Sequence, residues 1–129
     1  MRGILKALTV MAALVTVTTA AAAPVKTFTS KPFAGVKANT GTVTATVDMG
    51  KITLKVSDDF VIPDTPAPSW QIIDSKGNTY LLNQFRIKGD KTNRQITLPA
   101  YIKDVAKVQV WCSFAEVVLG ETSFDTIVK

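Results

Sequence analysis

The chain offers one side chain with distinctive chemistry, the thiol of its single cysteine, Cys112. Histidine is absent, which excludes serine–histidine triads, histidine-ligated zinc or haem, and blue copper. A thiol takes part in redox chemistry when it is accessible and a nearby cation or helix N-terminus stabilises its thiolate. A thiol among apolar side chains behaves instead as a small buried hydrophobe. The sequence leaves both roles open for Cys112.

Alternation around Cys112 predicts a β-strand with one apolar face. The apolar residues of the strand are Val108, Val110 and Cys112, and they alternate with Lys107, Gln109, Trp111 and Ser113. We therefore expect Cys112 on the apolar face, Trp111 on the opposite face, and Phe114 just beyond the strand. In three dimensions Lys107, Arg86 or Arg94 could approach the thiol and favour its ionised form.

The N-terminus has the layout of a secretory signal peptide. Two basic residues precede an uncharged apolar run, residues 7–19, which is short for a membrane span. Four alanines and then Pro24 follow, and cleavage after Ala22 fits best, with Ala23 as the alternative. We predict a signal peptide over residues 1–22 and one domain over residues 23–129, exported to the periplasm or the cell exterior, with no membrane association after cleavage.

Composition narrows the function classes for the exported part. Removal of Arg2 and Lys6 takes two charges from the formal +5, and the remaining +3 is too small and scattered to indicate nucleic-acid binding. A phosphate-binding loop, a nucleophile motif and a metal-ligand set are all missing from the sequence. A hydrolase or transferase is therefore improbable, whether the protein is an enzyme stays open, and we expect no cofactor and no metal.

The remaining chain reads as short strands separated by turn residues. Residues 42–48 and 51–56 alternate strictly and predict a first hairpin, and residues 70–74 and 79–82 predict a second. Residues 85–88 and 94–98 predict a third. A break at Gly120 is expected to separate strand 115–119 from a last strand, 122–128. The pattern predicts an all-β fold, an antiparallel sandwich or barrel of about eight strands after an N-terminal signal helix.

Three other features of the sequence concern contacts, either within the fold or with a ligand or partner. The irregular stretch 57–68 holds three prolines and also Asp58, Asp59 and Asp64, whose carboxylates we read as turn formers rather than as calcium ligands, because EF-hand spacing is missing. The basic residues of the predicted third hairpin are Arg86, Lys88, Lys91 and Arg94. They could meet an acidic partner, but the alternation favours a solvated outward face. Phe28 and Phe33 are expected to pack onto the sheet.

Four segments together resemble the DM-thirteen domain, a small exported β domain often found beside DOMON domains. They are Asp58-Asp59-Phe60, Pro68-Ser69-Trp70, Ile96-Thr97-Leu98-Pro99 and the run from Val108 to Gly120. The resemblance extends from about Phe28 to Phe124, and its most specific part is the valine–aromatic–cysteine strand. It implies a β-rich domain with a redox or electron-transfer role centred on Cys112. Asn39 departs from the family pattern, since a histidine is expected there.

The leading hypothesis is therefore a redox accessory domain in which Cys112, with Trp111 and Phe114 as neighbours, reacts with or contacts a redox partner protein. The alternative is a non-catalytic binding module in which Cys112 is a structural core residue. In that case the proline-rich stretch 57–68 together with Trp70, or the Arg86–Arg94 hairpin, contacts a protein or glycan. A third hypothesis is a dimer linked through a Cys112 disulfide, because an odd cysteine in an oxidising compartment is buried, reactive or paired with another chain.

Overall fold

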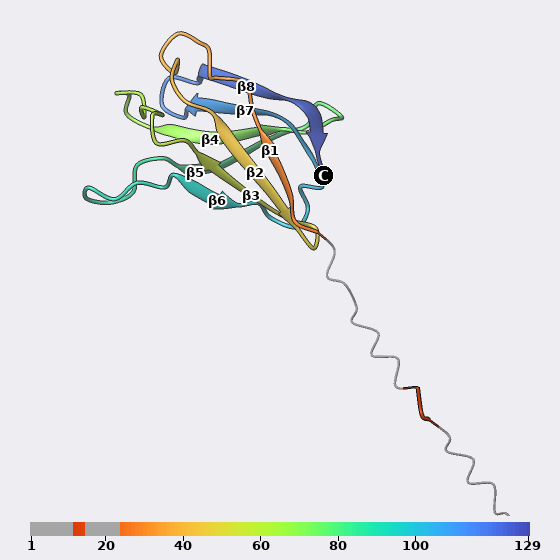
Figure 1. The fold of residues 1–129 in the computed structure, drawn as a ribbon. Helices are drawn as coiled ribbons and strands as arrows, with labels where there is room; N and C mark the ends of the chain where they lie inside the picture. Colours follow the sequence, from red (N-terminus) through yellow and green to blue (C-terminus); the bar gives the residue numbers. More distant parts are fainter. Residues whose placement is uncertain (1–11, 15–23) are drawn as a thin grey trace, which may run out of the picture.

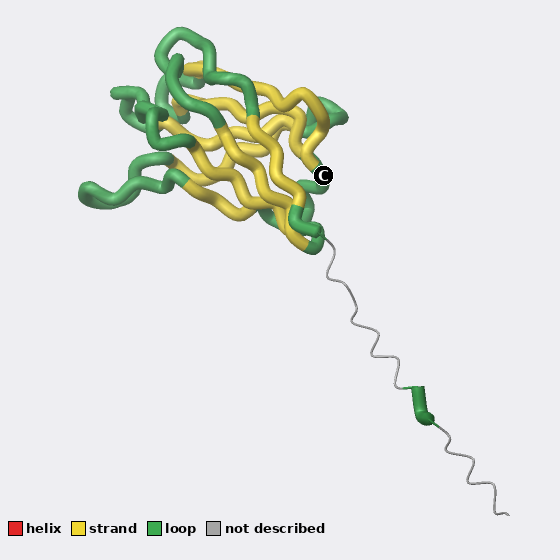
Figure 2. The backbone as a smooth tube through the Cα atoms, viewed as in Figure 1, coloured by secondary structure: helices red, strands yellow, loops and turns green. Residues whose placement is uncertain are grey.

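In the computed structural model, residues 12–14 and 24–129 are described. The predicted signal peptide and its cleavage site fall almost entirely outside these residues. No helix in the described part is long and apolar enough to cross a membrane. The described chain is all-β (Figure 2), with strands β1 (Lys26–Thr29), β2 (Val43–Asp48), β3 (Lys51–Val56), β4 (Pro68–Ile73), β5 (Thr79–Gln84), β6 (Gln95–Thr97), β7 (Val105–Cys112) and β8 (Val117–Val128).

The strands form two antiparallel sheets that pack face to face as a β-sandwich (Figure 1). One sheet has the order β1-β2-β3-β6 and the other β5-β4-β7-β8. Three connections cross between the sheets, from β3 to β4, from β5 to β6 and from β6 to β7. This confirms the predicted all-β sandwich.

The core lies between the inward faces of the two sheets. The alternation read from the sequence places Val43, Ala45 and Val47 of β2 inward, and the intervening threonines outward. The inner residues of β3, β4 and β7 meet them, and each is at most 2% exposed: Ile52, Leu54, Val56, Trp70, Ile72, Val105, Val108, Val110 and Cys112. Because one face of each sheet is apolar, packing the two faces together removes both from water.

The first two predicted hairpins are confirmed, and the third is wrong. Residues 85–94 form a loop with a single bridge between Arg86 and Thr92, and the strands on either side of it, β5 and β6, belong to different sheets. The apolar residue that suggested a hairpin strand, Phe85, is fully buried and stacks on Trp70 with ring centroids 4.6 Å apart. Phe85 therefore anchors a crossing between sheets rather than a turn within one sheet.

The expected break at Gly120 is also wrong, because β8 continues through it from Val117 to Val128. Only the register against β7 shifts there, between Val118 and Gly120. A side chain at Gly120 would lie 2.3 Å from the carbonyl oxygen of Ala38. Glycine is needed there because the segment before β2 lies directly against β8.

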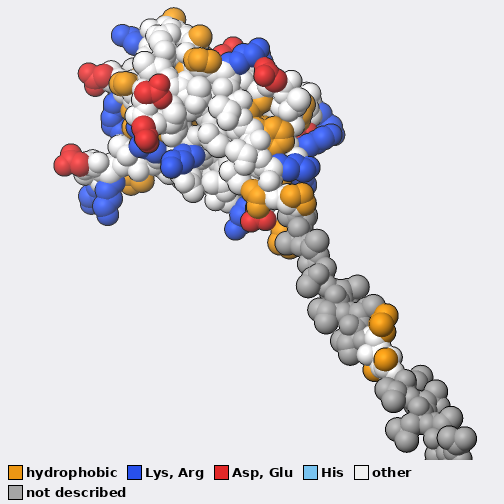
Figure 3. Space-filling view, viewed as in Figure 1, with side chains coloured by type: hydrophobic (Ala, Val, Ile, Leu, Met, Phe, Trp, Pro, Cys, Tyr) orange, Lys and Arg blue, Asp and Glu red, His pale blue; other side chains and the backbone are white. Residues whose placement is uncertain are grey.

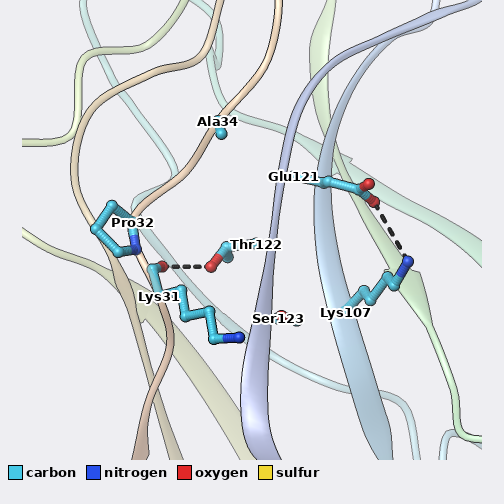
Figure 4. A pocket seen from close by; sticks show the side chains of 7 residues that line it. All are labelled: Lys31, Pro32, Ala34, Lys107, Glu121, Thr122 and Ser123. Carbon is cyan, nitrogen blue, oxygen red and sulfur yellow. Dashed lines mark hydrogen bonds and ion pairs between the residues drawn. The ribbon is translucent and has the colours of Figure 1, made fainter.

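That close approach closes one side of the sandwich. Backbone hydrogen bonds join Ala34 and Glu121 in both directions, and Lys37 and Ala38 both donate to the carbonyl of Leu119 at 2.9 Å. Figure 4 shows part of this contact, in which the Thr122 hydroxyl donates to the carbonyl of Lys31. Beside it, Lys107 of β7 pairs with Glu121 of β8 at 4.0 Å. Within the segment before β2, the side chain of Phe33 is buried, and Phe28 of β1 is partly buried. Both therefore pack onto the sheets, as predicted.

Trp70 provides a direct test of the core. Its side chain is fully buried, and its indole N–H donates to the carbonyl of Asn93 at 2.9 Å. Trp70→Ala removes this packing and should lower the free energy of unfolding by about 3–5 kcal/mol. The control Phe114→Ala removes a side chain that is 78% exposed, and it should change stability by less than about 0.5 kcal/mol. Urea denaturation measures both, and equal effects would contradict the assignment of Trp70 to the core.

Candidate functional site

Cys112 is the last residue of β7 and faces the core. Its neighbours across the sheet are Pro68 on β4 and Val117 on β8. The residue is 1% exposed and belongs to the same buried cluster as Val108 and Val110. The predicted strand and the predicted face are therefore confirmed, and the thiol is covered.

The sulfur closes the turn between β7 and β8. The backbone N–H of Ala115 donates to Cys112 Sγ, at a nitrogen–sulfur distance of 3.4 Å. The N–H of Glu116 donates to the Cys112 carbonyl at 2.7 Å, and Glu116 adopts a left-handed conformation with φ of 56°. The side chain of Cys112 thus satisfies a turn N–H that would otherwise lack a protein partner.

The proline-rich stretch covers the thiol from the other side. The N–H of Ser113 donates to the carbonyl of Ala67 at 2.9 Å, and the hydroxyls of Ser69 and Ser113 lie 2.9 Å apart. The Thr65 hydroxyl oxygen is buried without a hydrogen-bond partner among the described residues, and its nearness to the thiol makes a minor contribution in favour of the ionised form. A reagent from solvent therefore reaches the sulfur only if this stretch or the β7–β8 turn moves.

The pKa of the Cys112 thiol is lowered from its ordinary value. The main cause is the hydrogen bond from the Ala115 backbone N–H, and the N–H groups of Phe114 and Ala67 and the Thr65 hydroxyl add to it. Burial acts in the opposite direction and raises the pKa. The thiolate is thus favoured by backbone donors, not by the basic side chains that the sequence suggested.

Those basic side chains have structural partners instead. Arg94 donates from Nη2 to the carbonyls of Ser57 at 2.7 Å and Phe60 at 2.9 Å, and its guanidinium lies over the Phe60 ring. Arg86 donates to the carbonyls of Ile62 and Thr65, both at 3.2 Å. The two arginines hold the proline-rich stretch in place, a role that sequence reasoning missed because the bonds go to backbone groups far along the chain.

Four loop segments lie together at the end of the sandwich where β7 ends (Figure 1). We call this region the loop end, and it consists of residues 30–42, 57–67, 85–94 and 113–116. The first two are joined by a bond from the Val61 N–H to the Thr40 hydroxyl at 2.8 Å. Beneath the surface, Phe33, Phe60 and Phe85 form a row, with centroids 5.0 and 5.3 Å apart. The loops are therefore one connected surface rather than separate flexible tips.

The loop end exposes large apolar side chains. Phe114 is 78% exposed, Val36 75% and Val61 64%. Val117, at the start of β8, is 44% exposed. Figure 3 shows hydrophobic side chains at this end standing among acidic and basic ones. Several large apolar side chains are therefore exposed to solvent at one end of the sandwich.

The residues named from the sequence are thus partly brought together. Trp111 lies on the outer face of its sheet opposite Val118, and Phe114 extends into solvent while its backbone lies beside the thiol. Trp70 was expected as a contact residue in the binding alternative, and that expectation is wrong because the ring is fully buried.

In the described part of the chain, no three cysteine or acidic side chains lie close enough to hold a metal ion.

Comparison of the chain with protein-family models, with curated proteins and with solved structures finds no match. The resemblance to the DM-thirteen domain therefore stays a prediction from the sequence. The site is interpreted below from its own geometry.

The lowered pKa of Cys112 has a measurable effect on stability. Since the native thiol loses its proton at lower pH than the unfolded thiol, the native state binds fewer protons between the two pKa values, and stability rises with pH there. The stability advantage of the wild type over Cys112→Ala should therefore grow as the pH rises toward the ordinary thiol pKa of about 8.5, and should level off above it. Urea denaturation under reducing conditions measures the difference, and an advantage that shrinks with pH would show that burial outweighs the backbone donors.

Proposed function

We propose that this protein is a non-catalytic interaction module, exported as its N-terminus predicts, that contacts a partner protein through the loop end. In this proposal Cys112 is a structural residue. The observation that carries it is a contrast within one region: the thiol is 1% exposed, while Phe114, two residues further on, is 78% exposed.

Three features support contact with a protein rather than with a small molecule. The exposed side chains at the loop end are apolar and project outward, whereas small-molecule sites are concave. One of these side chains is the aromatic ring of Phe114, and aromatic residues are enriched at protein–protein interfaces. The loops are also tied by Arg86 and Arg94 and by the buried phenylalanines beneath them, so binding costs little ordering entropy.

Photocrosslinking tests the proposal in the cells that make the protein. A benzoylphenylalanine replaces Phe114 at the loop end, and in a matched variant it replaces Tyr101, which is 64% exposed. Tyr101 belongs to the connection between β6 and β7, which lies at the opposite end of the sandwich (Figure 1). Position 114 should give a discrete adduct with one protein, and position 101 should not. If position 114 gives no adduct, or both positions give the same adduct, the loop end is not the binding surface.

A redox function is the second candidate, and one observation favours it: the hydrogen bond from Ala115 N–H to the sulfur, which stabilises a thiolate. In this case Cys112 thiolate attacks a disulfide of an exported partner, forms a mixed disulfide and releases the partner's other sulfur as a thiolate. The β7–β8 turn and the proline-rich stretch would first have to separate. A disulfide-linked dimer through Cys112 requires the same opening, in both copies.

A further inference from the structure

The two sheets have four edge strands, and three of their free edges are covered or short. The edge of β8 is occupied by residues 31–38, which hydrogen bond to Leu119, Glu121 and Ser123. Strand β1 is four residues long, begins with Lys26 and leads directly into that covering segment. Strand β6 has only three residues and is followed by Pro99. Short strands, lysine and covering segments are the usual means by which edges avoid pairing with other chains.

In the described part of the chain, strand β5 has neither a lysine nor a covering segment. It has six residues, Thr-Tyr-Leu-Leu-Asn-Gln, with no charged residue and no proline. Among the residues that the structure describes, it pairs with β4 alone, so its second edge offers unpaired backbone groups. Thr79 to Leu81 pair with β4 in regular register, and a bulge at Leu82 and Asn83 shifts the register before Gln84 pairs with Ser69. An open edge without charged residues is a template for an added strand.

The side chains of β5 fit the same role. Tyr80 and Leu82 are partly buried and pack against the core, so an added strand would extend an apolar inner face. Leu81 pairs with Gln71 on the outer face and is 53% exposed. This leucine stands near the middle of the strand, where a neighbouring strand would cover it.

We propose that β5 is a dimerisation edge, at which β5 of a second copy pairs antiparallel across a two-fold axis. The two β5-β4-β7-β8 sheets then form one continuous sheet. Self-pairing suits this strand because no like charges face each other within Thr79–Gln84, and because the axis near Leu81 places the two leucines side by side. The contact uses neither Cys112 nor the loop end, so it goes beyond the proposed function.

Leu81→Lys tests the proposal, because it places like charges near the two-fold axis. The matched control is Ile87→Lys, which changes a similarly exposed apolar residue (49%) outside the strand. Sedimentation equilibrium of the exported form should show a concentration-dependent dimer for the wild type and for Ile87→Lys. For Leu81→Lys the dimerisation constant should fall by about tenfold or more. A wild type that stays monomeric, or equal losses in the two variants, would overturn the proposal.

Hydrogen exchange locates the contact and does not depend on the folding of a variant. Raising the concentration of the wild type should increase the protection of amides in Thr79–Gln84, and leave those of the short edge strand β6 unchanged. A dimer that protects β8 or the loop end instead would show that another surface pairs. Protection of β5 only in the presence of an added extended peptide, and not of a second copy, would assign the edge to a different partner.

Discussion

A row of buried aromatic rings determines the end of the sandwich where the function is proposed. Trp70 stacks on Phe85 at 4.6 Å, Phe85 contacts Phe60 at 5.3 Å, and Phe60 contacts Phe33 at 5.0 Å. One ring belongs to β4 and the other three to three different loops of the loop end. Large rings that exclude water hold loops together more firmly than surface hydrogen bonds can. The position of each loop therefore depends on this row.

The covering of Cys112 is one consequence. With Phe60 fixed, Arg94 reaches the carbonyls of Ser57 and Phe60, and the proline-rich stretch is directed across the end of β7. Ala67 can then accept the N–H of Ser113 beside the thiol. A cysteine at the end of a strand would ordinarily lie near solvent, and here two loop segments keep it in the core.

The sequence predicted the parts of this structure that depend on local pattern. Alternation identified β2, β3 and β7 and the face on which Cys112 lies, because side chains in a strand change sides at every residue. It wrongly paired residues 85–88 with residues 94–98, since Phe85 and Ile87 alternate with Arg86 and Lys88 as they would in a hairpin strand. These residues instead lie in a connection between two sheets. The continuity of β8 at Gly120 was equally hidden, because glycine is needed there by a contact with Ala38, more than 80 residues away in the chain.

The candidate site shows the same division between local and distant information. The strand and the face of Cys112 could be predicted, but its burial could not, because loop segments distant in the chain cover the thiol. The hydrogen bond that lowers its pKa comes from a turn whose backbone geometry no side-chain pattern reports. The arginines looked like a basic surface because their partners are carbonyl oxygens, which every residue carries. The free edge of β5 became visible only when the order of strands in each sheet was known.

The reactivity of the Cys112 thiol in the native protein tests the central claim most directly. If the aromatic row keeps the thiol in the core, a disulfide reagent such as Ellman's reagent should react with it only through transient opening. The reaction should then be far slower in the native protein than in urea, and Trp70→Ala should accelerate it as stability falls. Rapid reaction of the native protein, unchanged by Trp70→Ala, would contradict a structural cysteine and favour the redox function.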